Sequence, residues 1–231
     1  MTGPIINSSS LLVGGLLGAL GGRWLPERVK EGLILVFGII TIGLGAPLIG
    51  LTDTMHVVVL ALALGTILGE ALDLEARLDR GLRRLMARFS GQSSRDDAFF
   101  VQFITLLSLF CFGSLGIFGA ITEGVTRKPD TLLTKAALDF FTAAIFAAQL
   151  GPAIAGIALP QFAILALLYL SAGQLSPLIS EAMIADFSAV GGMIFIATGL
   201  RMCDIHQFRI INMLPSLLIV FWLTHLQSLW A

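Results

Sequence analysis

The chain has 231 residues, of which 56% are hydrophobic and only 13% are charged, and its formal net charge is −1. Soluble domains carry about 25% charged residues, so this composition excludes a soluble globular protein. The balanced charge also gives no basis for proposing nucleic acid or an acidic substrate as a partner.

Apolar runs of about 20 residues recur along almost the whole chain, and each is long enough to cross a hydrocarbon core of about 30 Å. Because backbone groups in lipid must bond to one another, such runs predict helices. We therefore expect an all-α, polytopic membrane protein of about eight transmembrane helices. The predicted spans are residues 3–22, 31–51, 55–73, 98–121, 133–157, 160–178, 183–200 and 208–229. The first is expected to be retained, because no Lys or Arg precedes it as in a signal peptide.

The stretch EARLDRGLRRLMARFSGQSSRDD, residues 75–97, is the clearest segment outside the membrane. Its leucines and Phe89 recur at helical spacing with arginines between them. This pattern predicts that the third span continues into an amphipathic interfacial helix, which a Gly/Ser linker ends. A solvated charged loop is the alternative.

The basic residues predict the orientation of the chain. With the N-terminus outside, the basic residues near 23–30, 77–95 and 201–209 are cytoplasmic, and only those between 127 and 135 are outside. This arrangement obeys the positive-inside rule better than its reverse. We therefore expect both termini outside and residues 75–97 in the cytoplasm.

A weak internal repeat appears when the chain is shifted by 105 residues. Gly14 then aligns with Gly119, Lys30 with Lys135 and Pro47 with Pro152, although chance similarity in a biased composition is the alternative. Three spans separate the two copies, so the copies would be inverted in the membrane, as in many secondary transporters. The predicted division is a first transmembrane repeat with the cytoplasmic amphipathic helix at 1–97, and a second repeat plus two C-terminal helices at 98–231.

Several segments carry a resemblance to a known family. They are GPIINSSSLLVGGLLG, LGTILGEALDLEARLDRGL, LFCFGSLGIFGAITEG followed by LLTKAALDFF, and FRIINMLPSLLIV. In these motifs the chain resembles the YqgA/YdfK-like family of bacterial inner-membrane proteins, whose function is unknown. The chain departs from the family pattern at Leu115, where Met is frequent. The resemblance implies a helical fold in the bacterial inner membrane and brings no substrate with it.

The glycine-rich stretch LFCFGSLGIFGAITEG, residues 109–124, is the first candidate site. Glycines allow close helix packing in membranes, which is the structural alternative. Gly113, Gly116 and Gly119 are three residues apart, so they form no single stripe along a helix. Together with Ser114, Gly113 and Gly116 favour a helix that breaks or approaches a ligand, where freed amides or carbonyls hold an ion.

Ionisable residues inside the spans are the second signal. Asp139 lies in the fifth span with Lys135 four residues earlier, a spacing at which the two side chains can pair. An intramembrane charge indicates function because its insertion is costly, although a structural ion pair near the interface is the alternative. Glu70 in the third span is a similar candidate, or an interfacial anion that starts the charged helix. Glu123 and Asp186 lie near span ends and are expected to be interfacial.

Asn7 and Asn212 are the last candidates, because each follows Ile-Ile near the start of a predicted span, Asn7 in the first and Asn212 in the eighth. Both fit a helix N-cap, and the functional alternative places both amides and the neighbouring serines beside a polar cavity.

Enzyme and metal signals are weak. The three histidines show no metal-ligand spacing, Cys111 and Cys203 lack a partner motif, and no Ser or Cys sits in a nucleophile motif. We therefore expect no enzymatic activity, no metal and no cofactor.

The favoured function is a small secondary transporter, an ion-coupled carrier for a small polar or anionic solute. An oligomeric channel and a non-transporting membrane scaffold are the alternatives. The expected partners are the lipid bilayer, a small solute, Na⁺ or H⁺, and a second copy of the chain in a homodimer. The predicted solute- and ion-binding residues are Asp139, Ser114, Gly113, Gly116, Lys135, Asn7, Glu70 and Asn212.

Overall fold

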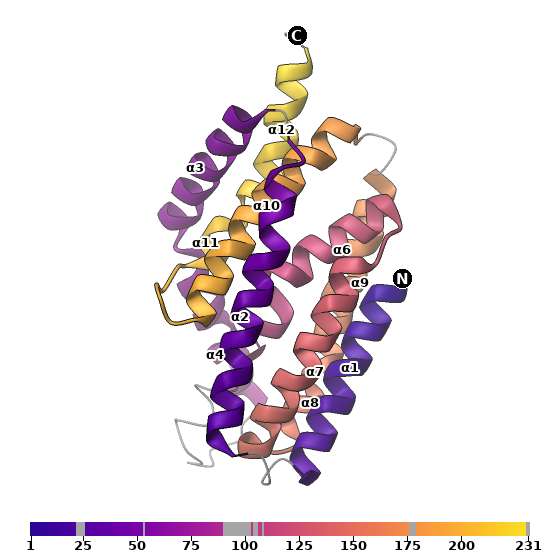
Figure 1. Ribbon diagram of the computed structural model, residues 1–231, viewed down its shortest axis with the longest axis vertical. Helices are drawn as coiled ribbons and strands as arrows, with labels where there is room; N and C mark the ends of the chain where they lie inside the picture. Colours follow the sequence, from indigo (N-terminus) through magenta and orange to yellow (C-terminus); the bar gives the residue numbers. More distant parts are fainter. Residues whose placement is uncertain are drawn as a thin grey trace.

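The computed structural model describes residues 1–21, 26–52, 54–89, 103, 106, 107, 109–175 and 179–229. These residues form an all-helical bundle (Figure 1). Eight of its helical segments are long and apolar enough to cross a membrane, which confirms the predicted fold class. The helices are α1 (Thr2–Gly21), α2 (Glu27–Ile49), α3 (Met55–Leu72), α4 (Leu74–Phe89), α6 (Ser114–Thr126), α7 (Asp130–Leu150), α8 (Ala153–Gly156), α9 (Ala158–Leu175), α10 (Glu181–Met202), α11 (Ile210–Met213) and α12 (Ser216–Ser228).

The largest differences from the predicted spans concern the fourth, fifth and sixth, and the sixth, Ala153–Gln174, begins at residue 153 instead of the predicted residue 160. The fourth membrane-spanning segment covers Leu109–Thr126, and part of the predicted range 98–121 lies outside the described residues. The fifth, Asp130–Leu150, ends before the predicted residue 157. Gly151 takes a positive φ of 78° there, a conformation that glycine tolerates and that ends a helix.

The predicted helix within 75–97 is present as α4, which extends to Phe89; residues 90–97 of this prediction lie outside the described part of the chain. It does not continue α3 smoothly. Asp73 between them has φ 46° and ψ 53°, the left-handed conformation, so the chain changes direction at this residue.

The helices pack as two groups. The first helix group consists of α1, α6, α7, α8 and α9, with α1 lying along α7 and α6 along α9. The second helix group consists of α2, α3, α10, α11 and α12, with α2 lying along α10 and α3 along α12. The principal contacts between the groups are α6 with α10 and α2 with α7. Figure 1 shows α2 and α10 side by side, and α7 beside α1.

These groups do not support the internal repeat. A repeat relating the first three spans to the next three requires α1 to pack on α2 and α3 as α6 packs on α7 and α9. The described residues give α1 at most marginal contact with α2 and α3, whereas α6 packs on both α7 and α9. The inverted repeat is therefore not confirmed, and the division at residue 97 remains a prediction.

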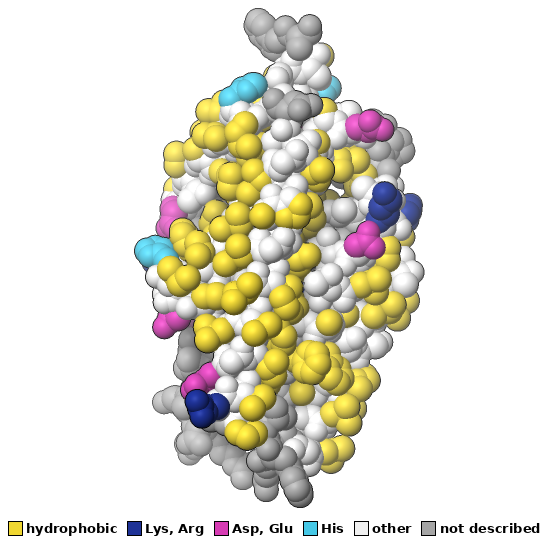
Figure 2. Space-filling model, viewed as in Figure 1, with side chains coloured by type: hydrophobic (Ala, Val, Ile, Leu, Met, Phe, Trp, Pro, Cys, Tyr) yellow, Lys and Arg dark blue, Asp and Glu magenta, His cyan; other side chains and the backbone are white. Residues whose placement is uncertain are grey.

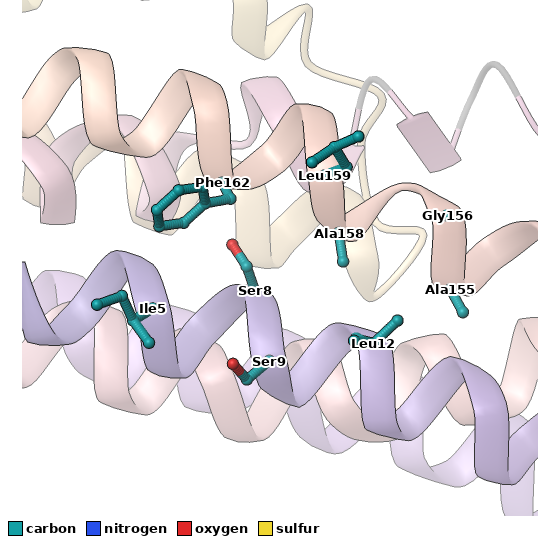
Figure 3. A pocket seen from close by; sticks show the side chains of 9 residues that line it. All are labelled: Ile5, Ser8, Ser9, Leu12, Ala155, Gly156, Ala158, Leu159 and Phe162. Carbon is teal, nitrogen blue, oxygen red and sulfur yellow. The ribbon is translucent and has the colours of Figure 1, made fainter.

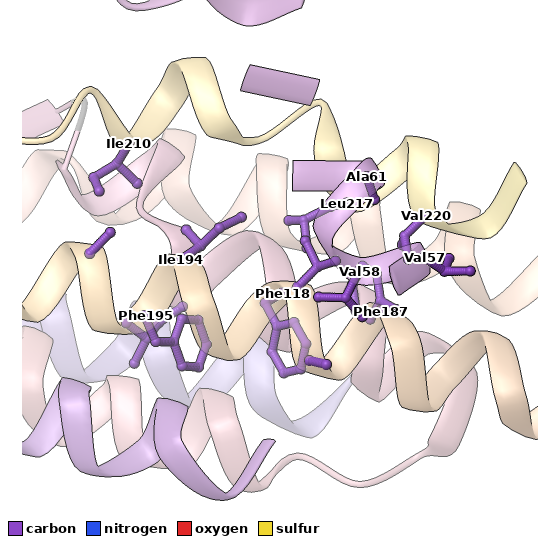
Figure 4. Packing of buried hydrophobic residues seen from close by; sticks show 14 residues of the cluster. Val57, Val58, Ala61, Phe118, Phe187, Ile194, Phe195, Ile210, Leu217 and Val220 are labelled. Carbon is purple, nitrogen blue, oxygen red and sulfur yellow. The ribbon is translucent and has the colours of Figure 1, made fainter. Parts of the chain in front are cut away.

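The main apolar core lies in the second group and receives one ring from the first. Phe118 of α6 stacks on Phe187, with 5.0 Å between ring centroids, and meets Phe195 edge-on at 5.2 Å (Figure 4). Leucines, valines and isoleucines are prominent among the exposed side chains, and Figure 2 shows one face on which hydrophobic side chains far outnumber charged ones. An apolar exterior is the arrangement that a lipid solvent favours.

Glycines set the closest helix contacts within each group. A Cβ added to Gly18 would lie 2.1 Å from the backbone oxygen of Ala144, so α1 and α7 touch through their main chains. Gly45 and Gly192 bring α2 and α10 together in the same way, since a Cβ on either would lie 2.5 Å from the other's carbonyl oxygen. Small residues allow this approach in membranes, where dispersion and weak polar contacts replace the hydrophobic effect.

We expect Gly18→Ala to destabilise the protein, because its methyl group requires α1 and α7 to separate. Gly43→Ala is the matched control, since nothing lies within 4 Å of a Cβ at that position of α2. Heat-induced loss of the monodisperse peak in detergent measures both variants. Equal thermal stability of Gly18→Ala and the parent protein would contradict this account of the helix contact.

Candidate solute-binding site

The centre of the site is an ion pair between Lys135 and Asp139, one turn apart on α7. Both side chains are buried, with exposed fractions of 5% and 10%. Two amides also donate to the same carboxylate oxygen, Oδ2 of Asp139: Asn7 Nδ2 of α1 at 2.8 Å and Gln161 Nε2 of α9 at 2.7 Å. An isolated carboxylate is very costly in an apolar medium, so the ammonium and the two amides explain how Asp139 is accommodated.

A break in the fourth span adds a backbone group to the site. Gly113 has φ −61° and ψ 143°, an extended conformation that separates the helical residues 109–112 from α6. Carbonyls in the last turn before such a break lose their partners within the helix. The carbonyl of Phe110 accepts instead from Lys135 Nζ at 3.4 Å and from Gln161 Nε2 at 3.2 Å. The interrupted helix and the ion pair are thus one hydrogen-bonded unit.

A cavity of about 160 Å³ opens beside this unit, where α2, α6, α7 and α10 meet. It therefore lies between the two helix groups. Its lining includes Lys135, Asp139 and hydroxyls from four helices, and its remaining walls are apolar. Ser114 Oγ lies 2.9 Å from Oγ1 of Thr198, which itself donates to the carbonyl of Ile194, so Ser114 acts as the donor to Thr198.

Most of the predicted site residues meet at this place. The cavity is lined by Asp139, Lys135, Gly113 and Ser114. Asn7 is not part of the lining and donates a hydrogen bond to Asp139. Gly116 faces Lys135 from α6, since a Cβ there would lie 3.1 Å from Lys135 Cε.

Glu70 and Asn212 lie elsewhere. Glu70 is exposed and pairs with Arg209 at 3.2 Å. Asn212 is buried in α11, and its Oδ1 accepts the backbone N–H of Glu75 at 2.8 Å, in the first turn of α4. The structure thus places these two residues together at the junction of α3, α4 and α11, away from Asp139. Neither asparagine caps its own helix, because Asn7 lies inside α1 and Asn212 inside α11.

Sequence reasoning missed Gln161 and the carbonyl of Phe110. Gln161 was detectable in principle, because a glutamine in an apolar run after Leu-Pro is an intramembrane polar residue that needs a partner. The backbone carbonyl has no sequence signal beyond the glycine that breaks the helix three residues later.

Glu123 and Asp186 lie near the ends of their spans, as expected, and both are buried inside the protein, with exposed fractions of 2% and 1%. Glu123 accepts the backbone N–H of Gly3 at 3.1 Å and 3.2 Å, which joins α6 to the first turn of α1. Asp186 of α10 accepts hydroxyls of Thr52 and Thr54 from the α2–α3 turn, and of Thr224 from α12 at 2.7 Å. Hydropathy alone placed both residues at span ends, whereas tertiary contacts bury them.

A second, larger hollow of about 490 Å³ lies between α1 and the α8–α9 segment (Figure 3). Ser8 and Ser9 contribute to it, but Ile5, Leu12, Leu159 and other apolar groups form most of its lining. Ser8 points toward α9 and its Oγ has no partner among the described residues. This groove is a feature of the apolar exterior and has no charged residue in its lining.

Among the described residues, no three His, Cys, Asp or Glu side chains are placed to hold a metal ion. The functional groups of the candidate site are accordingly an ammonium, a carboxylate, amides and hydroxyls.

Fold and site together define a polytopic helical membrane protein with a buried ion pair beside an interrupted helix. The chain belongs to the family described as "Protein of unknown function (DUF554)", whose model matches residues 2–225. It is similar to "Uncharacterized protein YqgA" of Escherichia coli (strain K12), with 40% identity over 99% of this chain and 98% of that protein. It is also similar to "Uncharacterized membrane protein YdfK" of Bacillus subtilis (strain 168), with 29% identity over 95% of this chain and 93% of that protein. These relatives confirm the family resemblance, and no solved structure matches the chain.

We expect Thr224→Val to destabilise the protein by about 1–3 kcal/mol, because it removes a donor from the buried Asp186 carboxylate. Thr134→Val is the control, since the Thr134 hydroxyl donates to the carbonyl of Asp130 in its own helix. Thermal unfolding in detergent followed by tryptophan fluorescence compares the two variants. An equal shift of the unfolding temperature in both variants would show that the Thr224–Asp186 hydrogen bond adds no more stability than the Thr134 hydrogen bond.

Proposed function

We propose that the protein is a small ion-coupled carrier for a small polar or anionic solute, with its binding site at the cavity beside Asp139. One observation carries the proposal: the buried Lys135–Asp139 pair lines a cavity at the break in the fourth span. Intramembrane charges commonly mark solute and ion pathways, and discontinuous helices commonly form the binding sites of secondary transporters.

The position of the cavity between the two helix groups supports a carrier. Backbone contacts through glycines lie within the groups, as for Gly18 with Ala144 and Gly45 with Gly192. Across the boundary the contacts are side-chain contacts, such as Phe118 on Phe187 and Ser114 with Thr198. In our proposal the two groups rock against each other as units and expose the cavity to each side in turn.

The same features favour a carrier over the two alternatives. A scaffold needs only apolar packing around Asp139, whereas this residue lines a cavity. A channel needs a continuous axial path, whereas the cavity is a local volume of about 160 Å³. Solutes at such a site bind between helices and require a conformational change for release.

We further propose that the protein works in the bacterial inner membrane as a homodimer, with both termini outside. The family resemblance supports the membrane, and the distribution of Lys and Arg supports the orientation. Na⁺ or H⁺ is the proposed coupling ion, because Asp139 is a carboxylate at the cavity.

We expect Asp139→Asn to abolish or uncouple solute uptake while leaving folding near normal, because it preserves shape and hydrogen bonding but removes the charge. Uptake of radiolabelled lactate, phosphate, glycine and glycerol into proteoliposomes under an imposed H⁺ or Na⁺ gradient measures the coupled activity, and counterflow measures exchange without coupling. Asp130→Asn is the matched control, since Asp130 is an exposed carboxylate in the first turn of the same helix. Normal gradient-driven uptake in Asp139→Asn would place the site elsewhere, and wild-type counterflow no faster than empty vesicles for every solute would refute the carrier proposal.

We also expect the N-terminus and α4 to face opposite sides of the membrane, with α4 in the cytoplasm. Cysteine substitutions at Thr2 and at Arg84, in a background without Cys111 and Cys203, report this through an impermeant maleimide added to intact cells. The Thr2 position should be labelled and the Arg84 position protected. Labelling of both positions from outside would disprove this topology.

A further inference from the structure

The charge balance of the cavity restricts what can enter it. Lys135 and Asp139 together carry no net charge, and both are buried. Asn7 and Gln161, which complete the cluster, are neutral. An additional charge in such a site is costly unless a partner of opposite sign accompanies it. A charged solute must therefore arrive with a compensating ion.

Two features of the cavity, the Lys135 ammonium and the N-terminus of α6, attract an anion. Lys135 lines it, and Gly116 lets the lysine stem lie close against α6, since a Cβ there would be 3.1 Å from Lys135 Cε. The first turn of α6, a helix of 13 residues, begins at the cavity with Ser114, and its N-cap Gly113 supplies no side-chain acceptor. Free amides at a helix N-terminus attract negative charge, so Lys135 and the start of α6 both favour an anion in this cavity.

The negative side has one group able to take up a proton. Asn7 of α1, Gln161 of α9, Ser114 of α6 and the cavity residues of α2 and α10 (Ile34, Thr41, Thr198 and Met202) do not titrate. Among the described residues near the pair, the remaining titratable group is the buried thiol of Cys111, which lies close enough to interact electrostatically with Lys135 and Asp139. Three donors bind Oδ2 of Asp139, and the described residues place none on its Oδ1. That oxygen is free to hold a proton.

The apolar lining and the volume of the cavity limit the size and polarity of the anion that fits. Leu115, Leu138 and Phe146 are among the apolar residues that line the cavity. Its volume of about 160 Å³ is below the roughly 300–1,000 Å³ of sites for drug-sized ligands. A small anion with a short apolar tail matches both features.

Building on the proposed carrier function, we propose that the cavity binds a short-chain monocarboxylate together with one proton. The carboxylate pairs with the Lys135 ammonium, which keeps its protons, and the proton from solvent binds Oδ1 of Asp139. The occupied site carries one positive and one negative charge, as the empty site does. The coupled step is therefore electroneutral symport of one anion and one proton.

Butyrate and its neutral isostere butyramide test the proposal by isothermal titration calorimetry of the purified protein. Measurements in phosphate and in Tris at the same pH give the number of protons taken up per bound ligand. We expect one proton per butyrate, an affinity about tenfold weaker for each unit of rising pH, and at least tenfold weaker binding of butyramide. Butyrate binding without proton uptake, or equal binding of butyramide, would overturn the proposal.

Variants separate anion binding by Lys135 from proton binding by Asp139. Asp139→Asn should bind butyrate without taking up a proton and without the pH dependence, because Lys135 is already unpaired. Lys135→Met should bind butyrate at least tenfold more weakly, and Asp130→Asn should behave as wild type. Proton uptake that persists in Asp139→Asn would show that the ligand binds as its neutral acid, against the proposal. If Asp139→Asn does not fold, the comparison of butyrate with butyramide in the wild-type protein still decides, because a site for the neutral acid binds the neutral amide equally well.

The result also separates this inference from the carrier proposal. Proton-linked butyrate binding without counterflow of [¹⁴C]butyrate in proteoliposomes would refute the carrier and leave the site standing. Counterflow of another solute in a protein that does not bind butyrate would refute this inference and leave the carrier standing. Nitrate bound as tightly as butyrate would refute the role assigned to the apolar walls.

Discussion

The accommodation of the Asp139 carboxylate inside the membrane is the constraint on which the first helix group depends. A charged group in this setting needs a counter-charge and filled hydrogen bonds. Lys135 supplies the charge from the same helix, and Asn7 and Gln161 supply amides from α1 and α9. The break at Gly113 adds the Phe110 carbonyl, which holds the lysine and the glutamine. Four membrane spans are therefore positioned by one cluster of polar groups.

Glycine contacts hold the helices together within each group, and side-chain contacts join the two groups. Where two backbones touch, as at Gly18 and Ala144, small displacements create overlap or a void, so the pair of helices is stiff. Where side chains meet across the boundary, as for Phe118 on Phe187, rotamer changes allow sliding. The molecule is thus stiff within each helix group and more adaptable between them, and the cavity lies at the adaptable boundary.

The sequence predicted the eight spans, α4 and the Lys135–Asp139 pair, because length, hydropathy and i,i+4 spacing are local properties. It also indicated an interruption near Gly113, since glycines three residues apart form no packing stripe. It did not predict that Asn7 meets Asp139 or that Asp186 is buried by threonines. Those facts depend on which helices are neighbours, and α1 lies beside α7 through contacts more than 100 residues apart in sequence. Hydropathy also placed the fifth span's end too late, because it does not register the positive φ of Gly151.

Three buried carboxylates show that burial alone does not identify a functional residue. Glu123 pairs with the N-terminal ammonium of Met1 at 3.4 Å and accepts the amide of Gly3, and Asp186 accepts threonine hydroxyls from two other segments. Each of these contacts fixes one element to another. Asp139 differs because its counter-charge is a flexible lysine and because both groups face a cavity between the helix groups. In our proposal Lys135 turns toward an incoming anion and Asp139 then takes up a proton, whereas the hydroxyls around Asp186 offer no such exchange. This proposed exchange of partners, more than burial, separates the site from the other two.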